Sequence, residues 1–199
     1  MTEHYYTENP NSAHDERQVT LTALGNALTF TTDAGVFSRD GLDRGTELLL
    51  EALPPLSGRV LDLGCGWGAV GVALGRKYPG LEIVMTDINR RAVELARRNL
   101  AANGVRAEVL QGDGFQAVTG AFDAIVTNPP IRAGKAVIYG LFRQAMDFLK
   151  PDGALYIVIR KQQGAPSALK YLKELYDRAG IIDRGSGFHV IRADGLSKK

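Results

Sequence analysis

Cysteine and histidine are scarce in this sequence. The only cysteine, Cys65, excludes an internal disulfide and any metal site built from several cysteines. The three histidines, His4, His14 and His189, show no metal-ligand spacing. We therefore expect no metal. Cys65 stands between two glycines, where a small filler is a better interpretation than a nucleophile.

Long apolar runs and a strong charge of either sign are also absent. The N-terminus has no apolar stretch like that of a signal peptide, and no uncharged apolar run has membrane-spanning length. These absences predict a cytoplasmic protein without membrane contact. A formal net charge of +2 and a pI near 8.7 permit an anionic partner without arguing for one. At 199 residues the chain suits one α/β domain and is short for two.

Short apolar runs alternate with helical patterns along most of the chain. The expected strands are 60–63, 81–88, 106–111, 122–127, 154–160, 181–183 and 188–192, the last two antiparallel. The expected helices are 46–53, 69–78, 89–103, 134–149 and 166–179. Alternation of this kind predicts a doubly wound, mostly parallel, seven-stranded Rossmann-like α/β sheet.

The N-terminal part precedes this alternation. Residues 17–32 predict a β-hairpin that turns at Gly25-Asn26. We expect an arm over residues 1–16, either loose or wrapped around the domain, and a single domain over 17–199. Within that domain, 17–53 is the hairpin and helix extension and 54–199 the core.

A glycine loop follows the first buried strand of the core. Gly64, Gly66 and Gly68 let the main chain turn sharply and leave room for a ligand against it. Gly66, Gly68 and Gly71 also match the G-x-G-x-x-G dinucleotide fingerprint, so a nicotinamide nucleotide stays an alternative. Asp62, expected at the mouth of the loop, favours a cationic ligand such as S-adenosylmethionine over a pyrophosphate.

Further acidic side chains follow the next two strands. Asp87 suits a ribose, and the Gly112-Asp113-Gly114-Phe115 loop could hold an adenine, with Asp113 accepting from its amine and Phe115 against its ring. The other interpretation of that loop is a plain Asp-Gly turn. Phe37 and Ser38 lie in a loop that could close over a ligand. Because ligands of doubly wound sheets bind beyond the carboxyl ends of the strands, we expect one crevice to collect these residues.

The most specific motif is Asn128-Pro129-Pro130 at the end of the strand 122–127. Each proline holds its predecessor extended, so the turn is stiff. It offers the Asn128 amide oxygen and the Pro129 carbonyl as two fixed acceptors for an amine conjugated to a ring. Accepting both N–H groups would aim the nitrogen lone pair at a methyl group, which is catalysis by orientation and preorganised dipoles.

These motifs resemble class I S-adenosylmethionine-dependent methyltransferases that act on planar amino groups. The chain is similar, more narrowly, to the methyltransferase small domain group, which includes the 16S ribosomal RNA guanine-N2 methyltransferases. The segments that carry the narrower resemblance are 4–10, 30–50 and 128–135. It implies S-adenosylmethionine as cofactor, guanine-N2 as target, and ribosomal RNA or the small ribosomal subunit as partner.

The resemblance also implies roles for individual residues. The implied catalytic residues are Asn128, Pro129 and Pro130, and the implied substrate-binding residues are Ile131, Arg132 and Lys135. The residue patterns and the resemblance together give the candidate cofactor-binding residues, which are Phe37, Ser38, Asp62, Gly64, Cys65, Gly66, Gly68, Asp87, Ile88, Asp113, Gly114, Phe115 and Asn128.

The chain departs from the group in two ways, and several alternatives stay open. Ile131 stands where many relatives have an aromatic residue, so stacking on a base would come from elsewhere, with Phe37 and Phe188 as candidates. A second, substrate-binding domain found in better-known members is not in this sequence. Adenine or a protein glutamine amide are alternative targets. A non-catalytic RNA- or ribosome-binding module with a relic cofactor pocket is the alternative of another class. Arg132, Lys135, Arg160 and Lys161 are candidate phosphate contacts.

Overall fold

The structure is a computed structural model that describes residues 8 and 12–196. His4 and most of the expected arm over 1–16 lie outside the described residues, as do residues 197–199. The described end of the arm contacts the domain. The Asp15 N–H donates to the Asp33 carboxylate over 2.6 Å, and the Arg91 guanidinium donates to the Ser12 carbonyl over 2.8 Å. This part of the arm therefore wraps the domain.

Strands and helices alternate as the sequence predicts. The strands are β1 (Arg17–Ala23), β2 (Asn26–Thr32), β3 (Arg59–Leu63), β4 (Glu82–Asp87), β5 (Glu108–Gln111), β6 (Phe122–Thr127), β7 (Leu149–Arg160), β8 (Tyr176–Gly185) and β9 (Phe188–Leu196). The α-helices are α1 (Arg44–Ala52), α2 (Ala69–Lys77), α3 (Arg90–Ala102), α4 (Lys135–Phe148) and α5 (Ala165–Leu175), with short 3-10 turns η1 (Ile131–Ala133) and η2 (Lys161–Gln163).

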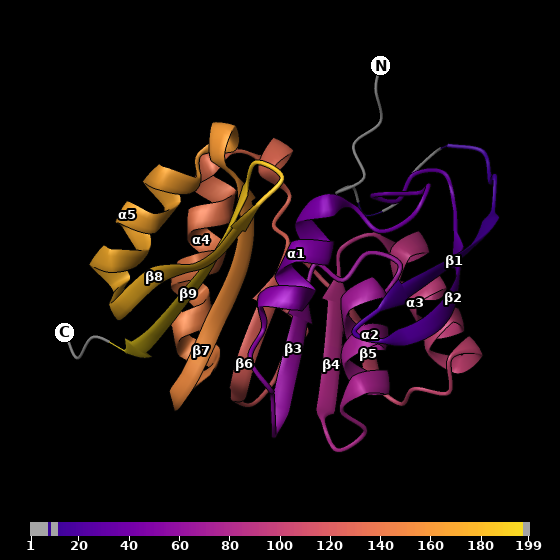
Figure 1. Cartoon of the computed structure of the whole chain (residues 1–199), viewed down its shortest axis with the longest axis horizontal. Coiled ribbons are helices and arrows are strands. Elements are labelled where there is room, and N and C mark those ends of the chain that lie inside the picture. Colours follow the sequence, from indigo (N-terminus) through magenta and orange to yellow (C-terminus); the bar gives the residue numbers. More distant parts are fainter. Residues whose placement is uncertain (1–7, 9–11, 197–199) are drawn as a thin grey trace.

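The main sheet has seven strands in the order β5-β4-β3-β6-β7-β9-β8 (Figure 1). β5, β4, β3, β6 and β7 are parallel, whereas β9 pairs antiparallel with both β7 and β8. The chain builds outward in one direction from β3 to β4 and β5, and in the other from β6 onward. The order therefore reverses between β3 and β6, and a ligand crevice is expected at the carboxyl ends of these strands.

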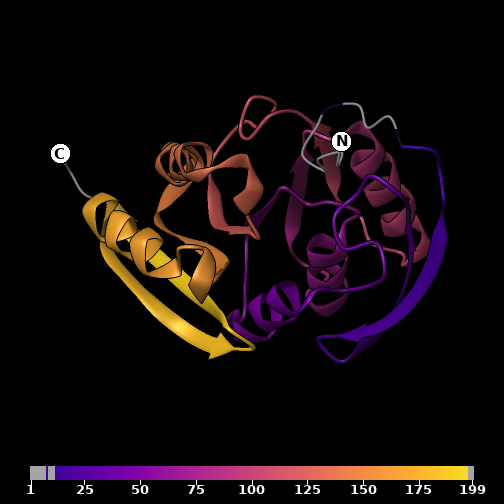
Figure 2. The same ribbon diagram turned by 90° about the horizontal axis from the view of Figure 1, so that it is seen from above.

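Helices cover both faces of the sheet, and each face has its own apolar core. One core contains the apolar sides of α1, α2, α3 and the hairpin, and the other those of α4 and α5. Figure 2 shows α1 and α2 on the opposite side of the sheet from α4 and α5. β3 and β6 lie between the two cores, which explains why their runs are apolar on both faces.

The N-terminal hairpin forms as predicted, but its turn lies one residue earlier. Leu24 and Gly25, both in the left-handed region at φ 50° and 79°, form the two-residue loop, as a type I′ turn requires. Asn26, expected in the turn, is the first residue of β2. The hairpin packs on α3, where the Asn99 and Asn103 side chains each bond both the N–H and the C=O of a β2 residue, Thr31 and Thr29 respectively.

The C-terminal part departs further from the expectation. The helix predicted to reach Ala179 ends at Leu175, because residues 176–185 pair as β8 with β9. The buried Tyr176 hydroxyl donates to the Phe142 carbonyl over 3.0 Å and holds the start of β8 on α4. β7 also begins at Leu149, five residues before its expected start, with an irregularity opposite Phe122. Local helical pattern yields here to strand pairing.

Across the described ranges, no helix combines the length and apolar character needed to cross a membrane. The same residues contain no group of three or more histidine, cysteine, aspartate or glutamate side chains that could hold a metal ion.

Candidate functional site

The glycine loop leaves β3 at its carboxyl end and opens onto the expected crevice. Gly64 and Gly66 adopt φ values of 74° and 55°, and a Cβ on either would meet nothing within 4 Å. The N–H groups of Gly64 and Cys65 donate to the Thr86 carbonyl over 2.8 and 2.9 Å, which fixes the loop to β4. The loop therefore presents bare main chain to open space, as a ligand that lies against it requires.

The remaining fingerprint glycines serve packing rather than ligand access. A Cβ on Gly68 would lie 3.2 Å from Ala96 of α3, and one on Gly71 would lie 2.5 Å from the Met85 sulfur. Cys65 is buried, and its pKa is raised by burial and by the charges of Asp87 and Asp62. These features of Cys65 agree with a small filler and disfavour a thiolate nucleophile.

Asp87 ends β4 and supports the glycine loop from below. Its Oδ2 accepts from the Gly66 N–H over 2.8 Å, and its Oδ1 accepts from the Asn89 N–H over 2.9 Å. Burial raises its pKa, although these hydrogen bonds oppose the shift. Each carboxylate oxygen retains acceptor capacity, so two vicinal hydroxyl groups of a ribose could donate to it.

The sequence predicts Asp62 at the mouth of the glycine loop. In the structure it is instead buried beneath the loop. Its side chain is only 3% exposed, and its Oδ2 accepts from the Gly71 N–H of α2 over 2.9 Å. Burial, together with the nearby Asp87 charge, raises its pKa to about 7. Asp62 is therefore not the carboxylate at the loop surface that the sequence predicts, because α2 is packed over it. Asp62 instead joins β3 to α2.

The loop after β5 is divided between solvent and core. Asp113 is exposed, and no described residue donates a hydrogen bond to its carboxylate. Gly114 turns the chain at φ 56°. Phe115 is only 4% exposed, and its ring stacks on that of Phe148 with 4.7 Å between the ring centres. The sequence predicts this ring against an adenine, but in the structure it belongs to the core. Ile88, also expected at the cofactor, is half-buried at the end of β4.

The loop that contains Phe37 and Ser38 lies against the glycine loop. The Phe37 carbonyl accepts from the Trp67 indole N–H over 2.9 Å, and the Gly35 carbonyl accepts from the Asn89 side chain over 2.9 Å. Ser38 has a left-handed backbone at φ 55°, and its hydroxyl donates to the Gly41 carbonyl over 2.5 Å. The Ser38 hydroxyl is thus used within the loop, whereas the Phe37 side chain is 39% exposed.

Asn128 follows β6 and is oriented by two residues of the α1 N-terminus. Its side-chain amide donates to Thr46 Oγ1 over 3.0 Å, and the Thr46 hydroxyl donates to Asp43 Oδ2 over 2.5 Å. Asp43 also caps α1 by accepting from the backbone N–H groups of Gly45 and Thr46. Because a carboxylate only accepts, the direction of this chain of hydrogen bonds assigns the NH2 of Asn128 toward Thr46. The Asn128 amide oxygen accepts no hydrogen bond from the described residues.

Pro129 is buried and Pro130 half-buried, and the chain then makes the 3-10 turn η1. The Ala133 N–H donates to the Pro130 carbonyl over 2.8 Å. Ile131 and Lys135 line a cavity of about 140 Å³ together with the start of α5, and Arg132 is exposed. The expected substrate-binding residues thus lie beside the turn, at the carboxyl ends of β6 and β7.

Sequence reasoning missed Asp43 and Thr46. The signal was present, since an acidic N-cap three residues before a threonine at the start of an apolar helix is a capping pattern. Phe188 lies on the same side of this site. A Cβ on Gly45 would lie 2.9 Å from its ring, and the Arg160 guanidinium lies over that ring at 5.2 Å. Phe188 therefore packs at the N-terminal end of α1, the end that also supplies the Thr46 hydroxyl to Asn128.

Comparisons with known proteins place this arrangement in a family. Residues 27–192 match the methyltransferase small domain. The chain is 40% identical over 198 residues to the uncharacterized protein YbxB of Bacillus subtilis (strain 168), covering 97% of this chain and 98% of YbxB. It is also 40% identical over 173 residues to ribosomal RNA small subunit methyltransferase C of Escherichia coli (strain K12 / DH10B), covering 84% of this chain and 47% of that protein.

One solved structure agrees with both the fold and the cofactor. It is the Thermus thermophilus 16S rRNA N2 G1207 methyltransferase (RsmC) in complex with AdoMet and guanosine, with a TM-score of 0.82 and 30% identity. The match covers 94% of this chain and 52% of that one, so this chain spans about half the length of the ribosomal RNA methyltransferases it matches. The open glycine loop and Asp87 fit the same cofactor. The chain belongs to the methyltransferase small domain family, and it is an S-adenosylmethionine-dependent methyltransferase.

Proposed function

We propose that this chain methylates the exocyclic N2 amine of a guanine in ribosomal RNA. The observation that carries the proposal is the orientation of Asn128. Its NH2 is bonded to Thr46, so its amide oxygen points away from that contact, and no described residue donates a hydrogen bond to it. An acceptor fixed in this way suits an N–H donor, which an exocyclic amine supplies and a hydroxylate or thiolate nucleophile does not.

In this proposal the chain orients the amine and needs no strong base. S-adenosylmethionine, when bound, would supply an electrophilic methyl group and leave as the neutral thioether, and the methylated amine would then lose one proton to water. Asn128 Oδ1 and the Pro129 carbonyl accept the two N–H groups of the amine, which draws electron density onto its nitrogen. Pro129 and Pro130 hold these acceptors stiffly, so little reorganisation is needed during the reaction.

The roles of the cofactor residues follow from their places in the crevice. We assign Gly64 and Gly66 to the methionine part of the cofactor, since both face open space. We assign Asp87 to the ribose hydroxyls and Asp113 to the adenine amine, because the Asp113 carboxylate is exposed. In this proposal Asp62 and Phe115 do not touch the cofactor. Asp62 fixes the position of α2, and Phe115 anchors the loop after β5 in the core.

The choice of guanine in RNA rests on the relatives and on one surface of the site. The relatives with this domain include ribosomal RNA small subunit methyltransferases, and the solved structure was determined with guanosine. Phe188 has Arg160 over its ring and packs on Gly45, the neighbour of Thr46 in α1, and we take it as the ring on which a base would stack.

A methyl-transfer assay tests the proposal. The purified chain, tritiated S-adenosylmethionine, and ribosomal RNA or small subunits from a strain lacking the protein are incubated together, and the labelled nucleotide is identified by mass mapping. We expect N2-methylguanine from the wild type and at least a 100-fold loss of turnover with Asn128→Ala. Cofactor affinity, measured by calorimetry, should change little in that variant.

The outcomes separate the alternatives. Labelled N6-methyladenine or a labelled glutamine amide would show a different target group, while the proposed role of Asn128 and Pro129 as acceptors would stand. RNA binding without turnover would leave a binding module. Full activity of Asn128→Ala would refute the mechanism.

A further inference from the structure

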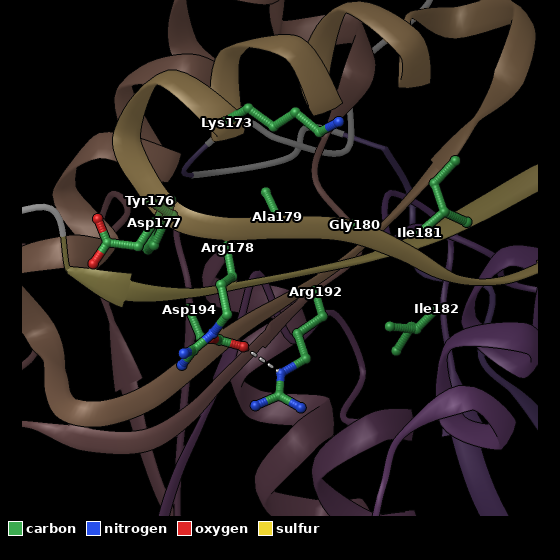
Figure 3. Close-up of a pocket in the computed structure, with 10 residues that line it drawn as sticks. All are labelled: Lys173, Tyr176, Asp177, Arg178, Ala179, Gly180, Ile181, Ile182, Arg192 and Asp194. Carbon is green, nitrogen blue, oxygen red and sulfur yellow. Dashed lines mark hydrogen bonds and ion pairs between the residues drawn. The ribbon is translucent and has the colours of Figure 1, made fainter.

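A large hollow lies at the free edge of the main sheet, far along the strands from the crevice. It has a volume of about 620 Å³ (Figure 3). Its lining residues come from the end of α5 and from β8 and β9, and they are Lys173, Tyr176, Asp177, Arg178, Ala179, Gly180, Ile181, Ile182, Arg192 and Asp194. Asp194 pairs with Ala154, the first residue of β7 that pairs with β9, so the hollow lies toward the amino end of this paired stretch. The crevice lies at the carboxyl ends.

Two arginines in this hollow share one buried carboxylate. Arg178 Nε donates to Asp194 Oδ1 over 2.5 Å, and Arg192 Nε lies 2.7 Å from Asp194 Oδ2. The Asp194 side chain is 8% exposed, whereas those of Arg178 and Arg192 are 77% and 43% exposed. Arg178 pairs across the strands with Asp194, and Arg192 precedes Asp194 by two residues, so all three lie on one face of the sheet.

This way of pairing leaves the outer edges of both guanidinium groups available. Each arginine is held through Nε, and no described residue accepts a hydrogen bond from the terminal nitrogens of either. The Arg192 guanidinium also lies over the Tyr156 ring, 5.9 Å from its centre, which limits its orientations. By contrast, Arg98 bonds Glu16 through both terminal nitrogens. Arg178 and Arg192 are thus oriented without using the groups that bind oxyanions in a bidentate way.

The charge and the access of this face suit an anion. The triad of Arg178, Arg192 and Asp194 carries two positive charges against one negative charge. Figure 3 shows the Asp177 carboxylate directed away from the two guanidinium groups. α5 packs on the other side of β8, and Figure 1 shows that α1 covers only the opposite end of this face. The guanidinium groups of Arg178 and Arg192 therefore face solvent from a concave, positively charged surface.

We propose that Arg178 and Arg192 form a phosphate-binding site on this face, with Asp194 as the residue that orients both. A phosphate group presents several oxygens to parallel N–H donors, which the two free guanidinium edges match. The phosphodiester backbone of the substrate RNA is the expected source, and this clause rests on the function proposed above. A free phosphate or nucleotide would present the same chemistry.

A simple structural tie between β8 and β9 is the competing explanation. Such a tie requires the Nε contacts only and predicts no effect on any ligand. It would show as a loss of stability in variants, with RNA and phosphate binding unchanged. Binding must therefore be measured alongside stability.

The experiment compares Arg178→Ala, Arg192→Ala and the double variant with the wild type. Binding to a fluorescein-labelled fragment of 16S ribosomal RNA is measured by anisotropy between 50 and 200 mM salt. Binding of inorganic phosphate is followed by phosphorus NMR of the phosphate itself, a signal that every variant can report. Arg98→Ala is the matched control, because its side chain is 52% exposed and its terminal nitrogens are already used. Thermal unfolding and S-adenosylmethionine affinity report whether each variant is folded.

We expect the double variant to lose about tenfold in RNA affinity and its salt slope to fall by about 1 to 2, since each phosphate contact contributes about 0.7 to 0.9. Each single variant should give a smaller loss and Arg98→Ala none. Unchanged RNA binding with lost phosphate binding in the double variant would support the site and make free phosphate or a nucleotide its ligand. Unchanged RNA and phosphate binding would overturn the proposal, as would an equal loss in Arg98→Ala. None of these readouts needs turnover, so a failure of the proposed methylation would appear separately.

Discussion

Removing the hydroxyl of Thr46 should disorder the Asn128 amide without touching the cofactor. Thr46 is the middle of the hydrogen-bonded chain from Asn128 to Asp43, and its side chain is 6% exposed. In Thr46→Val the volume is kept, but the acceptor for the Asn128 NH2 is lost. Water has little access there to replace it. The amide can then rotate and present its NH2, a donor, to the amine.

The magnitude follows from the type of bond. The hydrogen bond from the Asn128 amide to the Thr46 hydroxyl joins two neutral groups and contributes about 0.5–1.5 kcal/mol, which corresponds to roughly 2- to 10-fold in an orientation equilibrium. The Asn128 amide nitrogen also lies 3.4 and 3.5 Å from the two Asp43 carboxylate oxygens, so a weak second contact remains. We therefore expect the lower part of the range, about a threefold fall in kcat.

Single-turnover methyl transfer to guanine-containing RNA is the assay, with S-adenosylmethionine affinity measured in parallel. Thr46→Ser is the matched control, since it keeps the hydroxyl and should keep most of the rate. If Thr46→Val transfers methyl groups as fast as Thr46→Ser and both are folded, the chain of hydrogen bonds does not orient Asn128, and the reasoning fails.

Three other perturbations test separate parts of the structure. The pKa of Asp62 is raised to about 7 in the fold, so the wild-type free energy of unfolding should fall as pH rises from 4 to 7, by on the order of 4 kcal/mol, and then level off. Denaturation of Asp62→Asn at several pH values should show that fall reduced, and an unchanged profile would contradict the assignment. Gly71→Ala should lose about 1–3 kcal/mol of stability, measured by urea unfolding, because its Cβ would lie 2.5 Å from the Met85 sulfur. Phe188→Leu should raise KM for RNA by roughly 5- to 100-fold with kcat and cofactor affinity kept, as expected for a lost stacking surface, whereas an unchanged KM would remove it from the base site.

The parallel core of the fold was predictable because its signals are local. Val60, Leu61 and Leu63 form an apolar run that only a strand buried on both faces explains, and the glycines that follow must turn. The end of the sheet was less predictable. Residues 176–179 carry a helical pattern, and only their pairing with β9, which lies later in the chain, makes them a strand.

The candidate site divides in the same way. The positions of Asp87 and Asn128 at strand ends follow from their places after apolar runs. The burial of Asp62 and of the Phe115 ring could not be foreseen, because each depends on an element that is packed over it, α2 in one case and α4 with Phe148 in the other. The partnership of Asn128 with Asp43 joins residues 85 positions apart, and no local pattern reports it.

The Asn99 side chain couples the hairpin to the glycine loop, because it is hydrogen-bonded to both. The same amide nitrogen donates to the Thr31 carbonyl in β2 and to the Trp67 carbonyl between Gly66 and Gly68. Removal of the hairpin would leave the Asn99 side chain without its β2 partner and so weaken its hold on the glycine loop. The smallest fragment with a fully supported glycine loop therefore includes the hairpin and starts before β3. A chain shortened to residues 54–199 would keep the loop but lose part of the support that holds it in place.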